Sequence, residues 1–313
     1  MTGLGLNIAC YLFLGGSGGG LCLVASVLAL LAPRESVTAG MRSLNGRSYR
    51  CVLHVTPAYR RLFGPLYACA LVLLALGCLF LVADLGVSNR AVLLFLYPQP
   101  TLITFGAYAL SACMLLCLAL AAVWGLSLNY WRYRIVCVLE IVAAIAGFAV
   151  ALYSGLLLSS VQAVPLWHSP ALPVLFVTSA LSCGCAFALL ISGFAGSHDV
   201  FLRTMCQISA ADVVVIVLET LVVAVFFVFA FSNSYAVAGE GAWLLLQGGL
   251  RGPFALGFIG CGLVVPFALE VVELVTRKRL APVELVSAIS VLVGGFALRY
   301  CVVAVGSHPE VWM

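Results

Sequence analysis

The segment Tyr153–Phe176, YSGLLLSSVQAVPLWHSPALPVLF, joins two long apolar runs through a short polar connection. Pro165 cannot continue a helix because its ring removes a backbone donor, whereas Pro170 suits the first turn of a new helix. The segment therefore predicts a helix end, a turn and the start of the next helix at a membrane surface. Trp167 suits the boundary between water and lipid, and His168 offers an imidazole that can accept a proton. Together with the tyrosine that opens the segment, they form one wall of a predicted pocket.

The composition of the whole chain is that of a membrane protein. Of its 313 residues, 64% are hydrophobic and 8% are charged, and the mean hydropathy is +1.20. A soluble domain carries about 25% charged residues. The formal net charge of +4 comes from residues in short loops, so we expect no binding of nucleic acid.

Eight apolar runs are long enough to cross a hydrocarbon core, which takes about 20 helical residues. The runs are Asn7–Leu31, Phe63–Ala83, Pro100–Leu126, Ile135–Ser159, Pro170–Phe194, Ile208–Phe231, Gly252–Thr276 and Pro282–Val305. They leave no room for a soluble domain, and no internal repeat of the kind found in many transporters is visible. We predict an all-α integral membrane protein with a single transmembrane domain, residues 1–313, built as an eight-helix bundle.

The basic residues predict how the bundle is oriented. Twelve of the 15 Lys and Arg residues lie in the loops after the first, third, fifth and seventh spans. Because cytoplasmic loops carry the excess of Lys and Arg, we expect these loops in the cytoplasm and both termini on the non-cytoplasmic side. The largest of these loops, Pro33–Leu62, holds six arginines against Glu35 and is expected to lie on anionic membrane lipid.

The first span contains the glycine-rich run GGSGGG at Gly15–Gly20. It follows no predicted strand and has no Lys-Ser/Thr after it, so it does not fit a phosphate-binding loop. In membrane helices, small residues let a neighbouring backbone approach closely. We therefore favour close helix packing over direct ligand contact for this run.

Cysteine and histidine positions argue against a resident metal centre. Most of the 13 cysteines lie inside apolar runs, where a free thiol acts as a small hydrophobe. No Cys-x-x-Cys occurs, so we expect no iron–sulfur cluster and no other metal site in this chain. The four histidines are His54, His168, His198 and His308. All are expected in loops or tails, whereas a membrane cytochrome b holds haem between paired helix histidines, so we expect no haem.

Charged residues inside the spans are costly and need a partner or a function. Glu219 falls near the middle of the sixth span, and Arg299 falls in the outer half of the eighth. Glu140 and Glu270 fall nearer the cytoplasmic side, and with Glu219 they define a candidate proton relay. Structural ion pairs are the favoured alternative, above all for Glu273, which has an arginine one turn later.

Polar and aromatic groups also gather at the outer ends of the first, second and fourth spans and in the loop after the fourth. They are Asn7, Tyr11, Asp84, Tyr153, Trp167 and His168. A quinone needs an apolar slot and hydrogen-bond partners at its carbonyls, and this set, completed by Arg299, is the candidate quinone site. The alternative is that Trp and Tyr simply line the membrane surface, and that Asp84 only caps a helix.

Four parts of the chain, in order from the first span to the last, carry a family resemblance. They are YLFLGGSGGG at Tyr11–Gly20, LVADLG at Leu81–Gly86 with PQPTLITFGAYAL at Pro98–Leu110, the segment Tyr153–Phe176, and ALRYCVVAVG at Ala297–Gly306. The series resembles the NrfD / polysulfide reductase membrane-subunit family. The chain departs from that family in lacking a His near the start of the first helix, where Asn7 and Tyr11 stand instead.

The resemblance implies a quinone-binding subunit without haem, multi-pass in the prokaryotic cytoplasmic (inner) membrane. Such a subunit binds menaquinone or ubiquinone and exchanges electrons with a ferredoxin-like iron–sulfur subunit, which serves a molybdopterin or multihaem catalytic subunit. The quinone-contacting Tyr of the family maps onto Tyr153. We expect a non-catalytic subunit that oxidises quinol near the outer face and anchors its complex, with His168 accepting a proton and with possible coupled proton transfer.

Two other classes of function fit parts of the sequence. A secondary transporter or ion channel would use Glu219 and Arg299 as its substrate or ion site, but the broken helix pairs typical of transporters are not seen. An integral-membrane enzyme would need a metal cluster or a nucleophile–base pair, and the sequence indicates neither. Quinone bound to the purified protein would favour the respiratory subunit over the transporter.

Overall fold

The computed structural model describes residues 2–32, 38–42, 49–53, 57–84, 101–126, 133–161, 164–194, 198–232, 236–276 and 281–307. Within these residues, eight helical segments are long and apolar enough to cross a membrane. The prediction of an eight-helix membrane bundle is therefore confirmed. The side of the membrane on which each end lies stays a prediction.

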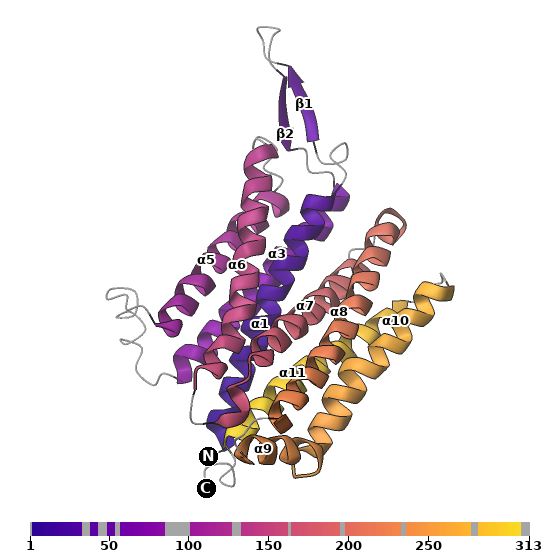
Figure 1. The fold of residues 1–313 in the computed structure, drawn as a ribbon. Coiled ribbons are helices and arrows are strands. Elements are labelled where there is room, and N and C mark those ends of the chain that lie inside the picture. Colours follow the sequence, from indigo (N-terminus) through magenta and orange to yellow (C-terminus); the bar gives the residue numbers. More distant parts are fainter. Residues whose placement is uncertain are drawn as a thin grey trace.

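The membrane-crossing segments include most of the described chain. They are α1 (Thr2–Leu31), α3 (Pro57–Asp84), α5 (Leu102–Gly125), α6 (Tyr133–Ser159), α7 (Ala171–Phe194), α8 (His198–Ser232), η2 (Pro253–Val264) continued by α10 (Val265–Thr276), and α11 (Ala281–Ser307). The shorter elements are the strands β1 (Thr38–Arg42) and β2 (Tyr49–Leu53), the 3₁₀ turn η1 (Pro165–Trp167) and the helix α9 (Ala236–Leu246). Figure 1 shows the start of α1, the end of α11 and α9 at one end of the bundle, with the two strands at the other.

Local sequence explains several element boundaries. Pro57 opens α3, where its missing N–H would have had no helical partner in any case. Thr101 caps α5, because its Oγ1 accepts a hydrogen bond of 3.3 Å from the backbone N–H three residues later. Pro165 begins η1, and the Ser169 hydroxyl accepts from Ala171 N at 3.3 Å where α7 starts. The predicted helix break and restart in this segment is thus confirmed.

Two connections contain structure that was not predicted from the sequence. Within Pro33–Leu62, the strands β1 and β2 pair antiparallel, with Thr38 opposite Leu53, and α3 already begins at Pro57. Between the sixth and seventh spans, α9 forms an eleven-residue helix. Neither element shows the long apolar run by which the spans were assigned.

The sixth span is longer than predicted. We placed His198 and Arg203 in a loop before Ile208, and this was wrong, because α8 is continuous from His198 to Ser232. Once a helix is nucleated, each further residue adds one hydrogen bond, so the helix extends past its apolar part into the polar stretch before it.

The seventh span begins as a π-helix, η2, before it continues as α10. Its Gly262 lies directly against Gly294 of α11, where an added Cβ on Gly294 would be 2.1 Å from Gly262 Cα. This backbone contact joins η2 to α11. A π-helical stretch of this length is uncommon, and apart from the glycines no sequence pattern indicated it.

Three helices form the centre of the bundle. In their apolar windows, 61% of α1, 72% of α7 and 67% of α11 is buried, against 22–33% in the other spans. The glycines of α1 bring it into close contact with its neighbours. A Cβ on Gly20 would lie 1.9 Å from Ala180 O of α7, and one on Gly19 would lie 2.9 Å from Gly147 O of α6. The predicted close-packing role of the glycine run is confirmed at these positions.

Candidate functional site

A narrow cavity between α1, α3, α5 and α6 contains two tyrosines from the candidate quinone set. Tyr11 of α1 and Tyr153 of α6 line it, with Gly15 and Gly16 of α1 and Ser154 of α6 beside them. The remaining lining residues are Leu12, Gly77, Leu81, Leu110 and Val150. We name this cavity the tyrosine slot. Its volume is about 30 Å³, which is room for about two water molecules.

The Tyr153 side chain is held in place by packing. Its ring lies against Gly106 of α5, where an added Cβ would come within 2.0 Å of Tyr153 Cζ. The side chain is 8% exposed, and its hydroxyl has no hydrogen-bond partner among the residues that the structure describes. A buried hydroxyl without a partner costs free energy. A carbonyl oxygen in the slot would remove that cost.

Two further members of the candidate quinone set lie near the slot without lining it. Asn7 is half-buried on α1, one turn before Tyr11. Asp84 is the last residue of α3, three residues after Leu81, which lines the slot. The Asp84 side chain lies outside the part of the chain that the structure describes. Both residues therefore stay predicted members of the site.

Trp167 and His168 do not line the tyrosine slot. Trp167 Nε1 donates a hydrogen bond of 2.8 Å to Val302 O, and the ring covers Gly306, so Trp167 ties η1 to α11. His168 is exposed, and its Nδ1 lies 3.3 Å from Ser159 O. It lines a second cavity of about 300 Å³ between η1, the start of α7 and the end of α8. The structure thus separates these two residues from the two tyrosines.

Arg299 is fully buried in the centre of the bundle. Its Nη1 donates to Ser179 Oγ at 3.1 Å and to a backbone carbonyl one turn earlier in α11 at 2.8 Å. Its Cζ lies 5.5 Å from the ring centre of Phe176 and 5.8 Å from that of Phe13, within the range of cation–π attraction. Within the described ranges, Nε and Nη2 have no hydrogen-bond partner. A Cβ on Gly16 would lie 3.0 Å from Nη2, so α1 separates Arg299 from the slot.

Glu219 of α8 is the acidic partner that could not be identified for Arg299 from the sequence. Its carboxyl is hydrogen-bonded to the Ser179 hydroxyl, which also accepts from Arg299, and it attracts the Arg299 guanidinium. Glu219 and Arg299 are 3% and 0% exposed. This arrangement agrees with the structural ion-pair alternative for Glu219.

Asp212, which was not predicted as a site residue, belongs to a further buried group of carboxyls. It lies two turns before Glu219 on α8 and accepts a hydrogen bond of 2.8 Å from Ser182. It also contacts the Glu270 carboxyl of α10, and Ser287 of α11 donates to Glu270 at 3.0 Å. Two carboxyls in contact away from water are stable only if they hold a proton. The spacing of seven residues, which puts Asp212 and Glu219 on one helix face, could have revealed this group.

Glu140 is held in a different network. Trp124 Nε1 donates to Glu140 Oε1 at 2.7 Å, and the Tyr67 hydroxyl donates to Oε2. The Ser26 hydroxyl lies 3.2 Å from that of Tyr67. These side chains come from α1, α3, α5 and α6, whereas Glu219 lies on α8, which packs mainly against α7 and α10. The structure therefore does not bring Glu140 together with Glu219 and Glu270.

Comparison with known proteins gives a match over nearly the whole chain. The family described as "Polysulphide reductase, NrfD" matches residues 4–308. The C subunit of polysulfide reductase from Wolinella succinogenes is 31% identical over 168 residues, which is 54% of this chain and 53% of that protein. Protein NrfD of Escherichia coli is 28% identical over 173 residues, 54% of this chain and 52% of that protein. The chain thus spans about half the length of the curated relatives that it matches.

Proposed function

Because this chain belongs to the NrfD family, we propose that it is the membrane subunit of a respiratory oxidoreductase complex. In this proposal, menaquinol or ubiquinol releases two electrons and two protons at the tyrosine slot. The electrons pass to a ferredoxin-like iron–sulfur subunit that serves a molybdopterin or multihaem catalytic subunit. The names of the two relatives, a polysulfide reductase subunit and NrfD, support such an assembly. The chain itself binds quinone and anchors the complex in the inner membrane.

The observation that carries the quinone assignment is the buried Tyr153 hydroxyl, which lacks a partner among the described residues and lies beside an apolar slot. A quinone carbonyl accepts hydrogen bonds, so Tyr153 would donate to it while the apolar walls enclose the ring. A ring needs more space than about 30 Å³, so binding has to widen the slot between α1 and α3. Asn7 and Asp84 stay in the proposal as polar groups at its outer end. His168, on the second cavity, is left out of the slot.

The first prediction concerns the Tyr153 hydroxyl. Tyr153→Phe keeps the ring that packs on Gly106 and removes only the oxygen. One lost hydrogen bond costs about 0.5–1.5 kcal/mol, and about 1.4 kcal/mol is tenfold in rate. We therefore expect quinol oxidation by the intact complex to slow by about three- to tenfold, measured as quinol:acceptor turnover at equal protein level.

The matched control for this change is Tyr59→Phe. Tyr59 lies in the first turn of α3, at the opposite end of that helix from the slot, and stacks on Phe63. Its turnover should equal that of the wild type. Equal turnover in Tyr153→Phe as well, with the complex intact, would exclude the slot as the quinone site. If purified protein also lacked bound quinone, the transporter or channel alternative with Glu219 and Arg299 at its centre would be favoured.

Coupled proton transfer is the second part of the proposal, and the contact of Asp212 with Glu270 favours it. Together with Glu219, these carboxyls line a buried path along α8 and α10. Asp212→Asn keeps the size and the acceptor for Ser182 but cannot take up a proton. We expect proton transfer in proteoliposomes to fall by about a hundredfold, with uncoupled quinol oxidation unchanged. Glu140→Gln, in the separate network, should leave proton transfer intact; a loss there instead would restore the relay predicted from the sequence.

A further inference from the structure

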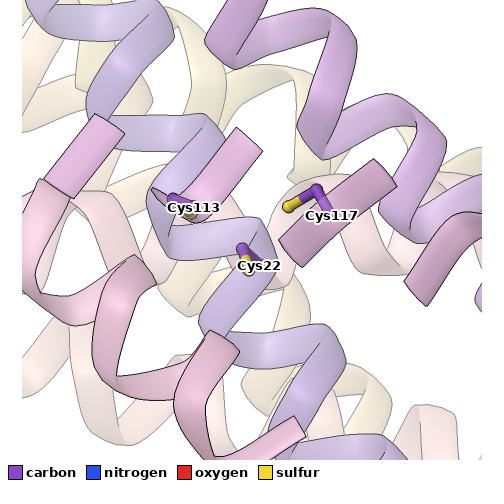
Figure 2. Close-up of side chains that lie close together, drawn as sticks. All are labelled: Cys22, Cys113 and Cys117. Atoms are coloured by element: carbon purple, nitrogen blue, oxygen red, sulfur yellow. The ribbon is translucent and has the colours of Figure 1, made fainter. Parts of the chain in front are cut away.

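Cys22, Cys113 and Cys117 form a buried group of thiols, the thiol cluster, that the proposed function does not use. Figure 2 shows the three side chains lying close together, one from α1 and two from α5. Their sulfur atoms all lie within 4.8 Å of one another, and each residue is 0% exposed. Spacing alone did not reveal the cluster, because Cys22 is distant in sequence from the other two.

The sulfur positions are close to those that a soft metal ion requires. Thiolate sulfur binds such ions at about 2.3 Å, so three sulfurs in a plane around one ion stand about 4.0 Å apart. From a separation of 4.8 Å, each sulfur would have to move by only about 0.5 Å. Cys113 and Cys117 lie one turn apart on the same face of α5, so small side-chain rotations bring them together.

The surroundings favour an ion with few ligands and a low charge. Zinc takes four ligands in structural sites, whereas the metal-binding group found among the described residues has three. Glu140 lies nearby, but Trp124 and Tyr67 occupy its two carboxyl oxygens. An uncompensated thiolate away from water is costly, and a monovalent ion requires fewer thiolates than a divalent ion for the same net charge. Among monovalent ions, Cu(I) is the one that cysteine thiolates select.

We propose that the thiol cluster is a binding site for a soft monovalent metal ion, with Cu(I) as the best fit. Binding releases one proton for each thiol that ionises, and no electron transfer is involved. The Cys22 thiol now donates to Ala143 O at 3.6 Å and would exchange that weak bond for the metal. The bound ion would fasten α1 to α5, two helices that otherwise have little direct contact. This site does not depend on the proposed function.

The test is the copper content of the full chain, purified anaerobically in detergent from cells grown with added copper. We expect about one copper per wild-type chain and less than about a tenth of that in Cys22→Ser and in Cys113→Ser. Cys69→Ser and Cys137→Ser change half-buried thiols outside the cluster and should keep the wild-type content. X-ray absorption on the wild type should show a shell of sulfur alone at about 2.3 Å, which requires no variant to fold.

Three results would overturn the proposal. One is wild-type protein that carries less than about a tenth of a copper per chain. Another is copper that persists undiminished in both cluster variants. The third is an absorption spectrum with nitrogen or oxygen in the first shell, which would place the ion away from the three thiols.

Discussion

Arg299→Met is expected to lower the free energy of unfolding by about 3–5 kcal/mol, because it breaks a buried charge pair by removing one partner. Methionine retains apolar contacts with the rings of Phe13 and Phe176 but carries no charge. Glu219 then stays buried on α8 with its hydrogen bond to Ser179, and the cation that balanced it is gone. The measurement is the unfolding midpoint of the purified protein in mixed detergent micelles.

A second substitution separates loss of the pair from loss of packing. Replacing both members of a buried pair can be nearly neutral, so Arg299→Met combined with Glu219→Gln should recover most of the lost stability. Arg251→Met removes an exposed arginine at the start of the seventh span and should leave the midpoint unchanged. A double variant as unstable as the single one would mean that the two residues do not act as a pair.

Gly20→Ala is expected to prevent α1 and α7 from packing. The new Cβ would lie 1.9 Å from Ala180 O, and the contact is reciprocal, since a Cβ on Gly184 would lie 2.5 Å from Gly20 C. Backbone atoms cannot rotate away as a side chain can, so the helices must separate. The cost should exceed the about 1–3 kcal/mol of ordinary overpacking. We expect less than about a tenth of the wild-type yield of folded protein, because about 1.4 kcal/mol is a factor of ten.

Gly15→Ala is the matched control, five residues earlier on the same helix. Nothing lies within 4 Å of a Cβ built at Gly15, so this variant should fold at the wild-type yield. Folded protein is measured as the monodisperse fraction in size-exclusion chromatography. Normal yield of Gly20→Ala would contradict the close contact between α1 and α7.

Much of the fold could be predicted, because a hydrocarbon core restricts both the length and the composition of what crosses it. Every predicted span overlaps one of the eight observed segments. The prediction failed where apolar length is not the deciding property. The hairpin β1–β2 and the helix α9 lie outside the spans, and the polar first part of α8 follows from helix propagation rather than from hydropathy.

The candidate site could be predicted in depth but not in lateral position. Sequence position within a span indicates how far a residue lies from the membrane surface. It does not show which helices stand beside it. Trp167 and Tyr153 were both expected near the outer surface, but one contacts α11 and the other lies against α5. For the same reason Glu140 was grouped with Glu219, although the two belong to separate networks.

The central place of α1 has a consequence for how the protein is made. Ribosomes add about 5–20 residues per second, so the 250 residues from Leu31 at the end of α1 to Ala281 at the start of α11 take about 12–50 s. During that time the glycine face of α1 meets lipid or the insertion machinery in place of α7 and α11. The helix that becomes most enclosed is therefore inserted long before its partners exist. Newly made chains should be most vulnerable to membrane proteases in this interval, before α11 arrives and brings Arg299 to Ser179.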